Sequence, residues 1–114
     1  MNKNCIFCKI INKEIFTKII FEDDLVLAFD DVHPVASVHV LIIPKKHFES
    51  INDLTKTQKN ERLMGRLILV AKQIASDRGI AEKGYKLLIR TGKEGGQEVP
   101  HIHLHLMGGI SNCS

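Results

Sequence analysis

The stretch VPHIHLHLMGG, residues 99–109, alternates histidines with apolar residues over most of its length. Successive side chains of a β-strand point to opposite faces, so residues two apart share a face at a spacing of about 6.6–7 Å. The pattern predicts a strand over residues 101–107 whose apolar side chains enter the core. The opposite face then carries one row of imidazoles, which consists of His101, His103 and His105.

Three histidines in strict register need a chemical explanation. A half-exposed strand with polar side chains on its wet face explains one histidine easily, but three in succession poorly. Two functional interpretations remain at this point. The row binds a catalytic metal, since imidazole is a common zinc ligand, or one histidine attacks a substrate directly while its neighbours handle protons and charge.

The segment TGKEGGQEV, residues 91–99, precedes the histidines and is rich in glycine. Glycine permits positive φ and a close approach of the backbone, at Gly92, Gly95 and Gly96. Inward-facing amides in such a loop form an anion nest, although a plain hairpin connection has the same composition. Because the loop leads directly into the histidine row, the combination favours chemistry at phosphorus over general metal-dependent hydrolysis.

Length and composition indicate one domain spanning residues 1–114. The chain is 44% hydrophobic and 25% charged, which are ordinary globular values. No apolar run approaches the roughly 20 residues of a membrane span, and the N-terminus does not resemble a secretory signal, so we expect a cytoplasmic protein without a membrane partner. The net charge of +3 and 5% aromatic content argue against nucleic-acid binding and suit a small anionic ligand.

Periodicity predicts an α+β fold, a mostly antiparallel meander with one long helix on one face. A short helix is expected near residues 4–15, and residues 18–24 and 25–31 form a hairpin. A third strand covers residues 37–44, with burial on both faces. The long helix begins at Thr55 or Thr57 and buries Leu63, Leu67, Val70, Ala71, Ile74 and Ala75. Two further strands cover residues 84–90 and 101–107.

Seven motifs occur in order along nearly the whole chain, from about Cys5 to Gly109. They are CIFCKIINKEI, IIFEDD, LAFDDVHP, LIIPKKH, GGQEV, HIHLHL and the final GG. With these motifs the sequence resembles the histidine triad (HIT) family, and most closely its Hint branch of nucleoside phosphoramidases. The resemblance implies a HIT-like fold with a five-stranded sheet. It also implies a homodimer in which two sheets join into ten strands.

The resemblance further implies a mechanism. His103 looks like the nucleophile that attacks the α-phosphorus of a purine nucleoside phosphoramidate and forms a nucleotidyl-histidine. Water then releases AMP or GMP. His105 looks like a phosphate-contacting partner that stabilises developing charge, and His101 orients the row from its end. No cofactor is required for catalysis in this interpretation.

A set of substrate-binding residues follows from the same resemblance. Asp31 matches the family position whose carboxylate receives the ribose hydroxyls. The apolar walls of the base pocket are Phe7, Ile10, Phe29 and Val32, for which core packing is the competing explanation. The phosphate side consists of Gly96, Gln97, Glu98 and Val99 with His103 and His105, and the inward amides of Gly96, Glu98 and Val99 hold phosphoryl oxygens there.

Cys5 and Cys8 form a C-x-x-C pair, which alone is a weak indication of a metal. Relatives with this pair are similar in binding zinc through it together with the positions of His47 and His101. Four protein ligands leave no open position, so the resemblance implies a structural Zn²⁺. The third cysteine, Cys113, receives no predicted role.

Two positions depart from the family pattern. Arg90 stands where an Asn that contacts ribose or phosphate is usual, so its contact with the substrate is open. Pro100 replaces a frequent aromatic residue. Arg90 keeps one alternative to the phosphoramidase open, a nucleotide-binding interaction module with vestigial catalysis. A hydrolase with a catalytic zinc is a further alternative, which the histidine row itself leaves open.

Overall fold

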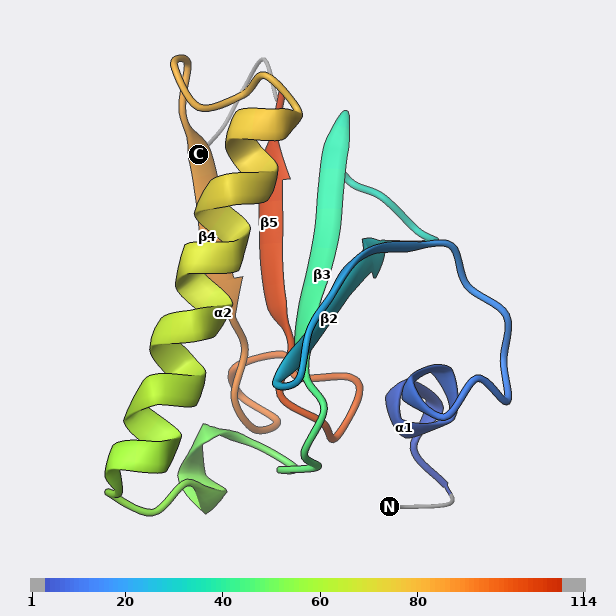
Figure 1. The fold of residues 1–114 in the computed structure, drawn as a ribbon, viewed down its shortest axis with the longest axis vertical. Coiled ribbons are helices and arrows are strands. Elements are labelled where there is room, and N and C mark those ends of the chain that lie inside the picture. Colours follow the sequence, from blue (N-terminus) through green and yellow to red (C-terminus); the bar gives the residue numbers. More distant parts are fainter. Residues whose placement is uncertain (1–3, 110–114) are drawn as a thin grey trace.

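The structure is a computed structural model that describes residues 4–109, so Cys113 lies outside the described residues. Two α-helices, a 3₁₀ turn and five strands follow one another along the chain (Figure 1). In order they are α1 (Ile6–Ile11), β1 (Ile19–Glu22), β2 (Val26–Asp30), β3 (Val38–Pro44), the 3₁₀ turn Ile51–Asp53, α2 (Gln58–Asp77), β4 (Tyr85–Ile89) and β5 (Leu104–Gly108).

The five strands form one sheet in the order β1-β2-β3-β5-β4, and every neighbouring pair is antiparallel. The predicted fold class is confirmed, but the simple meander is wrong, because β5 lies between β3 and β4. The long helix carries the chain from β3 across to the far edge, where β4 forms. Strand β5, which carries part of the histidine row, then returns into the interior of the sheet.

The two faces of the sheet have different cores. On one face α2 packs over Val40, Ile42, Leu104 and Leu106, and its buried residues are the six predicted from the helical period. On the other face α1 packs over Leu27, Phe29, Leu41 and Ile43. Strand β3 is buried on both faces along nearly its whole length, as predicted. The second face, on the side of α1, is the one toward which the histidines point.

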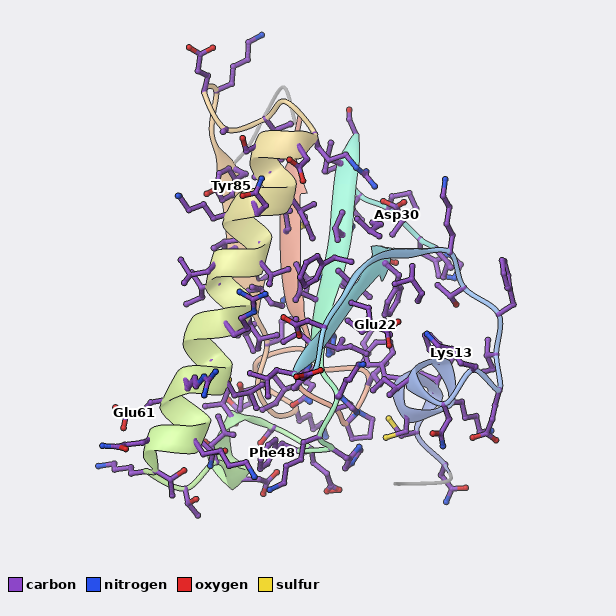
Figure 2. All side chains as sticks on the ribbon, in the orientation of Figure 1. Lys13, Glu22, Asp30, Phe48, Glu61 and Tyr85 are labelled. Atoms are coloured by element: carbon purple, nitrogen blue, oxygen red, sulfur yellow. The ribbon has the colours of Figure 1, made fainter. Side chains whose placement is uncertain are left out.

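Local signals explain where the elements begin and turn. Thr57, one of the two predicted caps, accepts a hydrogen bond from the Asn60 amide and begins α2. Asp23 accepts from the amides of Leu25 and Val26 and so fixes the turn between β1 and β2. Lys13, after α1, pairs with Glu22 of β1 at 3.0 Å (Figure 2). This pair connects the segment after α1 to the edge of the sheet.

The predicted final strand is shorter than its alternating pattern, since β5 begins only at Leu104. Pro44 has no amide proton, and its carbonyl oxygen accepts from the His101 side chain at 2.8 Å. The Ile102 amide donates to Phe48 outside the sheet. The ladder between β3 and β5 therefore stops at the pair Ile42–Leu104, although the side chains of residues 101–103 continue the alternation. None of the described helices is both long and apolar enough to cross a bilayer.

Candidate functional site

A cavity of about 640 Å³ opens on the α1 side of the sheet, a volume typical of small-molecule sites. Strands β2, β3, β4 and β5 supply its floor, and α1 with the loop after β4 supplies its walls. Seven of its lining side chains are titratable: Asp31, His33, His39, Arg90, Glu98, His103 and His105. The predicted nucleophile, ribose ligand and phosphate-contacting residue therefore share one cavity.

His103 is held in one orientation by the backbone. Its Nδ1 lies 2.7 Å from the carbonyl oxygen of His101, and because a carbonyl only accepts, Nδ1 carries the proton. The unprotonated Nε2 has no hydrogen-bond partner among the described residues. Burial lowers the pKa of His103 below its usual value, since desolvation disfavours the charged ring. The ring against the cavity is therefore neutral and presents a lone pair at Nε2.

His105 receives its orientation from a chain of hydrogen bonds that begins at the backbone. The amide of Val35 donates to Nδ1 of His39 at 3.2 Å, so the proton of a neutral His39 is on Nε2. That nitrogen lies 2.9 Å from Nδ1 of His105 and donates to it. The remaining proton of His105 is therefore on Nε2. Burial first, then His103 and His39, lower the pKa of His105 to about 4.

Asp31 lies at the end of β2, where its carboxylate is fixed on both sides. One oxygen accepts from the His33 amide at 2.8 Å, and the other lies 3.3 Å from Nε2 of His39. Each carboxylate oxygen has a further lone pair. The group lines the cavity, so its remaining lone pairs are available to hydroxyl donors there.

The four predicted apolar wall residues all line the cavity. Phe7 packs edge-on against Phe29 and against the ring of His103, with centroids 5.8 and 5.1 Å apart. Phe7, Phe29 and Ile10 are buried, whereas Val32 is 80% exposed. The first three therefore serve the core as well as the cavity, and Val32 belongs to its rim.

The glycine-rich loop is held together by Gln97, which does not line the cavity. Its amide nitrogen donates to the carbonyls of Glu49 and Val99, and its amide oxygen accepts from Gly92. Gly96 adopts the expected positive φ of 80°, but its amide donates to Lys93 within the loop. The Gly96 amide is thus not free to hold a phosphoryl oxygen, which corrects that expectation.

Two predicted phosphate donors remain in this loop. Among the described residues, the amides of Glu98 and Val99 have no acceptor, and both residues line the cavity. Arg90 lines it too, at the end of β4. The guanidinium makes a long contact of 3.4 Å with the Gly95 carbonyl and lies over Gly96, where a side chain would approach it to 3.2 Å.

The predicted metal ligands form a second cluster, beneath α1. Ligand atoms of Cys5, Cys8, His47 and His101 lie within 4.8 Å of one another. Nδ1 of His101 is 3.3 Å from Sγ of Cys5, 3.7 Å from Sγ of Cys8 and 3.1 Å from Nδ1 of His47. His101 is fully buried, and burial lowers its pKa to about 4. Burial also raises the pKa of the Cys5 thiol.

The donor set of this cluster fits a tetrahedral metal ion. Zn–S bonds of about 2.3 Å and Zn–N bonds of about 2.05 Å give tetrahedral edges of about 3.5 Å for S–N and about 3.3 Å for N–N, close to the distances above. Nε2 of His101 donates to Pro44, which leaves the lone pair on Nδ1, toward the cysteines. Such an outer partner is how proteins orient a metal-binding imidazole.

Asp31, His39 and His105 also bring three potential ligand atoms within 4.8 Å of one another. Here the outer partner has the opposite effect, since the Val35 amide occupies the lone pair of Nδ1 on His39. Nε2 therefore carries a proton and donates rather than binds an ion. Hydrogen bonding accounts for this group.

Sequence reasoning missed His39. The signal was present, because His39 is the one polar side chain in a strand that was expected to be buried on both faces. Leu41, Leu88 and Met107 also line the cavity. Nothing in their local sequence distinguishes them from other core residues.

The geometry agrees with the comparisons to known proteins. The family model of the HIT domain matches residues 12–112. A relative from Escherichia coli (strain K12) named purine nucleoside phosphoramidase is 49% identical over 109 residues, which cover 96% of this chain and 90% of the relative.

Solved structures give the same result. A HIT family hydrolase from Legionella pneumophila is 46% identical, with a TM-score of 0.89 over 95% of each chain. A HIT family hydrolase from Clostridium thermocellum is 41% identical, with a TM-score of 0.93 over 100% of this chain and 97% of the other. Together with the cavity and its histidine row, these matches show that the chain belongs to the HIT family.

Proposed function

We propose that this chain is a hydrolase of purine nucleoside phosphoramidates that releases AMP or GMP through a covalent intermediate on His103. The observation that carries the proposal is the hydrogen bond of 2.7 Å from Nδ1 of His103 to the His101 carbonyl. It leaves Nε2 unprotonated against the cavity, so the ring attacks without first losing a proton.

In the first step, Nε2 of His103 forms a bond to the α-phosphorus and the bond from phosphorus to the amine breaks. The electron pair leaves with the amine, which takes up one proton from water. In the second step, water attacks phosphorus, the bond to Nε2 breaks, and one proton returns to solvent. The sum is hydrolysis of one phosphoramidate to an amine and a nucleoside monophosphate.

The neighbouring groups assist both steps without adding to the bonds made and broken or to the protons exchanged. Nε2–H of His105 donates toward the phosphoryl group, and the amides of Glu98 and Val99 stabilise the oxygens where negative charge grows. Asp31 accepts the ribose hydroxyls, and Phe7 and Phe29 contact the base.

The test uses adenosine 5′-phosphoramidate and mass spectrometry of the intact protein after rapid acid quenching. We expect an adduct heavier by one adenylyl group, and no adduct or turnover in His103→Ala, which still binds AMP. Full turnover in that variant overturns the assignment. AMP binding with neither adduct nor turnover in the unmodified protein indicates a nucleotide-binding module instead.

The Cys5, Cys8, His47 and His101 cluster supports a structural zinc. These four side chains would hold the ion and leave it no open position, so it would supply rigidity rather than reaction chemistry. The residue that connects it to the cavity is His101, whose side chain belongs to the cluster and whose carbonyl orients His103.

A homodimer remains part of the proposal. Two observations support it: Ile68 and Leu69 of α2 are 50% and 59% exposed, and within the described residues β4 pairs only with β5. An apolar strand with a free edge is usually covered. Sedimentation at micromolar concentration tests this, with a dimer expected and a monomer contradicting it.

A further inference from the structure

Phe16, in the segment between α1 and β1, is the most exposed large apolar side chain of the described residues. It is 94% exposed. Eight large apolar side chains are exposed in the described part of the chain, and five of them line the cavity: Ile6, Ile15, Phe16, Val32 and Val35. Phe16 is the one aromatic residue of the eight. The apolar surface that the fold leaves uncovered is therefore concentrated at the cavity, and such a concentration marks a binding surface.

The pairing of β1 with β2 places Phe16 near the proposed ribose site. Ile19, the first residue of β1, is paired with Phe29 of β2. Phe16 precedes Ile19 by three positions and Asp31 follows Phe29 by two, so both segments leave the sheet at the same corner (Figure 1). Thr17 lines the cavity there together with Phe16 and Asp31. A ligand whose ribose hydroxyls reach Asp31 thus has its nucleobase within reach of Phe16.

The buried aromatic residues of the cavity cover only part of a nucleobase. Phe7 and Phe29 are buried and pack edge-on against each other, so each offers a small area to a ligand. A base has two apolar faces, and the second face remains in water unless an exposed side chain covers it. Phe16 supplies the one aromatic ring of the described residues that is both exposed and part of the cavity lining.

Phe16 is free to cover a ligand because the protein does not use its side chain. The amides of Glu14 and Ile15 donate to the carbonyl of Lys9 in α1, which holds the segment up to Ile15. Phe16 itself forms no hydrogen bond and no ring contact with any described residue. Packing on a ligand therefore breaks no contact within the protein, and it removes apolar area from water, which is favourable.

We propose that Phe16 is a specificity-determining residue that packs on the outer face of the nucleobase and favours a purine over a pyrimidine. This inference rests on the proposed function, because it takes the ribose to lie at Asp31. The two fused rings of a purine cover more of the Phe16 side chain than the single ring of a pyrimidine. The favourable free energy of burial grows with the apolar area covered.

Calorimetry with AMP, CMP and ribose 5-phosphate tests this contact without turnover. We expect Phe16→Ala to weaken AMP binding about fivefold, the scale of one aromatic contact, and to weaken CMP binding less. Binding of ribose 5-phosphate stays unchanged, because this compound has no base. Phe16→Tyr keeps the ring and most of the affinity. Ile51→Ala is the matched control, since Ile51 is exposed and apolar but lies outside the cavity, and it changes none of the three affinities.

A fluorescent probe gives a second measurement. The chain contains no tryptophan, so the emission of Phe16→Trp reports on this position alone. We expect AMP to quench this emission and ribose 5-phosphate to leave it unchanged. Ile51→Trp, the control, responds to neither compound. An emission of Phe16→Trp that does not respond to bound AMP overturns the inference.

The other outcomes are distinguishable. If Phe16→Ala weakens AMP and ribose 5-phosphate equally, the side chain acts on the ribose or phosphate, and if it weakens neither, it faces solvent. Equal losses for AMP and CMP show no purine preference, and dissociation of a dimer with unchanged AMP binding assigns Phe16 to an interface between copies. Each of these results overturns the inference. If the unmodified protein binds AMP but cleaves no phosphoramidate, the proposed function fails while calorimetry still decides the role of Phe16.

Discussion

Nε2 of His39 lies 2.9 Å from Nδ1 of His105, and the direction of this hydrogen bond is set by a backbone amide. The Val35 amide donates to Nδ1 of His39, so the His39 proton is on Nε2 and points toward His105. The proton of His105 is then on its own Nε2, where the proposed function has it donate to the phosphoryl group. A backbone amide in the loop before β3 thereby determines which atom of His105 donates.

Replacing His39 tests this chain of bonds. We expect His39→Leu to lower kcat by about a hundredfold, the scale of a mispositioned reacting group, because His105 loses the donor that fixes its tautomer. His39→Gln keeps a side-chain N–H and retains more activity. Steady-state kinetics over a range of pH check this, and the acid limb of kcat changes only if His39 acts through His105. Equal kcat values for the two variants contradict the positioning role.

The lowered pKa of His103 predicts that phosphoramidase activity persists in mildly acidic solution. In the proposed mechanism His103 must be neutral to attack, and burial lowers its pKa below the usual value of 6.5. The attacking form persists as pH falls through 6.5 and is lost only at lower pH. We expect kcat/KM for a phosphoramidate to stay level from about pH 8 to pH 6.5 and to fall below that. A midpoint above 6.5 contradicts the burial of this ring.

Removing the cysteines tests the metal cluster. Cys5→Ser with Cys8→Ser is expected to abolish zinc binding and to lower the thermal midpoint, since a bound ion would link α1 to residues far along the chain. Elemental analysis and thermal unfolding measure both effects, with Cys113→Ser as the control for loss of a thiol. Turnover at 25 °C is expected to decrease but not to be abolished. If a chelator stops turnover while the fold remains intact, the ion is catalytic.

Gln97 is expected to affect substrate binding without touching the substrate. Its side chain joins the loop at Gly92 to the backbone of Glu49 and Val99. Gln97→Ala releases these contacts, so the Val99 and Glu98 amides lose their fixed positions and kcat/KM falls about tenfold. Glu94→Ala on the same loop is the matched control. Equal kinetics for the two variants contradict the role of Gln97.

Much of the fold follows from local patterns. The long helix was predicted from the spacing of six apolar residues, and the burial of β3 from its unbroken apolar run. Strand order was not accessible in this way, because the position of β5 between β3 and β4 depends on where a twenty-residue helix delivers the chain. The early end of the final ladder depends on Pro44 and on a side chain 57 positions away.

The sequence indicated which residues come together in the candidate site, but it did not indicate most of their contacts. The alternation correctly put three histidines on one side, yet it gave no hint that His101 turns away into the cysteine cluster. That arrangement came from the resemblance alone. In the glycine-rich loop the Gly92 amide donates to the Gln97 side chain and the Gly96 amide donates to the Lys93 carbonyl. Local spacing carries no information about such bonds.

The ring and the carbonyl of His101 connect distant parts of the chain. Its ring meets Cys5 across 96 positions of sequence, while its carbonyl aligns the very next histidine in the row. Residues near the two ends of the described chain meet at His101, so we expect this contact to precede the alignment of His103, the proposed nucleophile. A growing polypeptide therefore carries an unoriented His103 until β5 has docked, so the proposed reaction is expected only after the described part of the chain has folded.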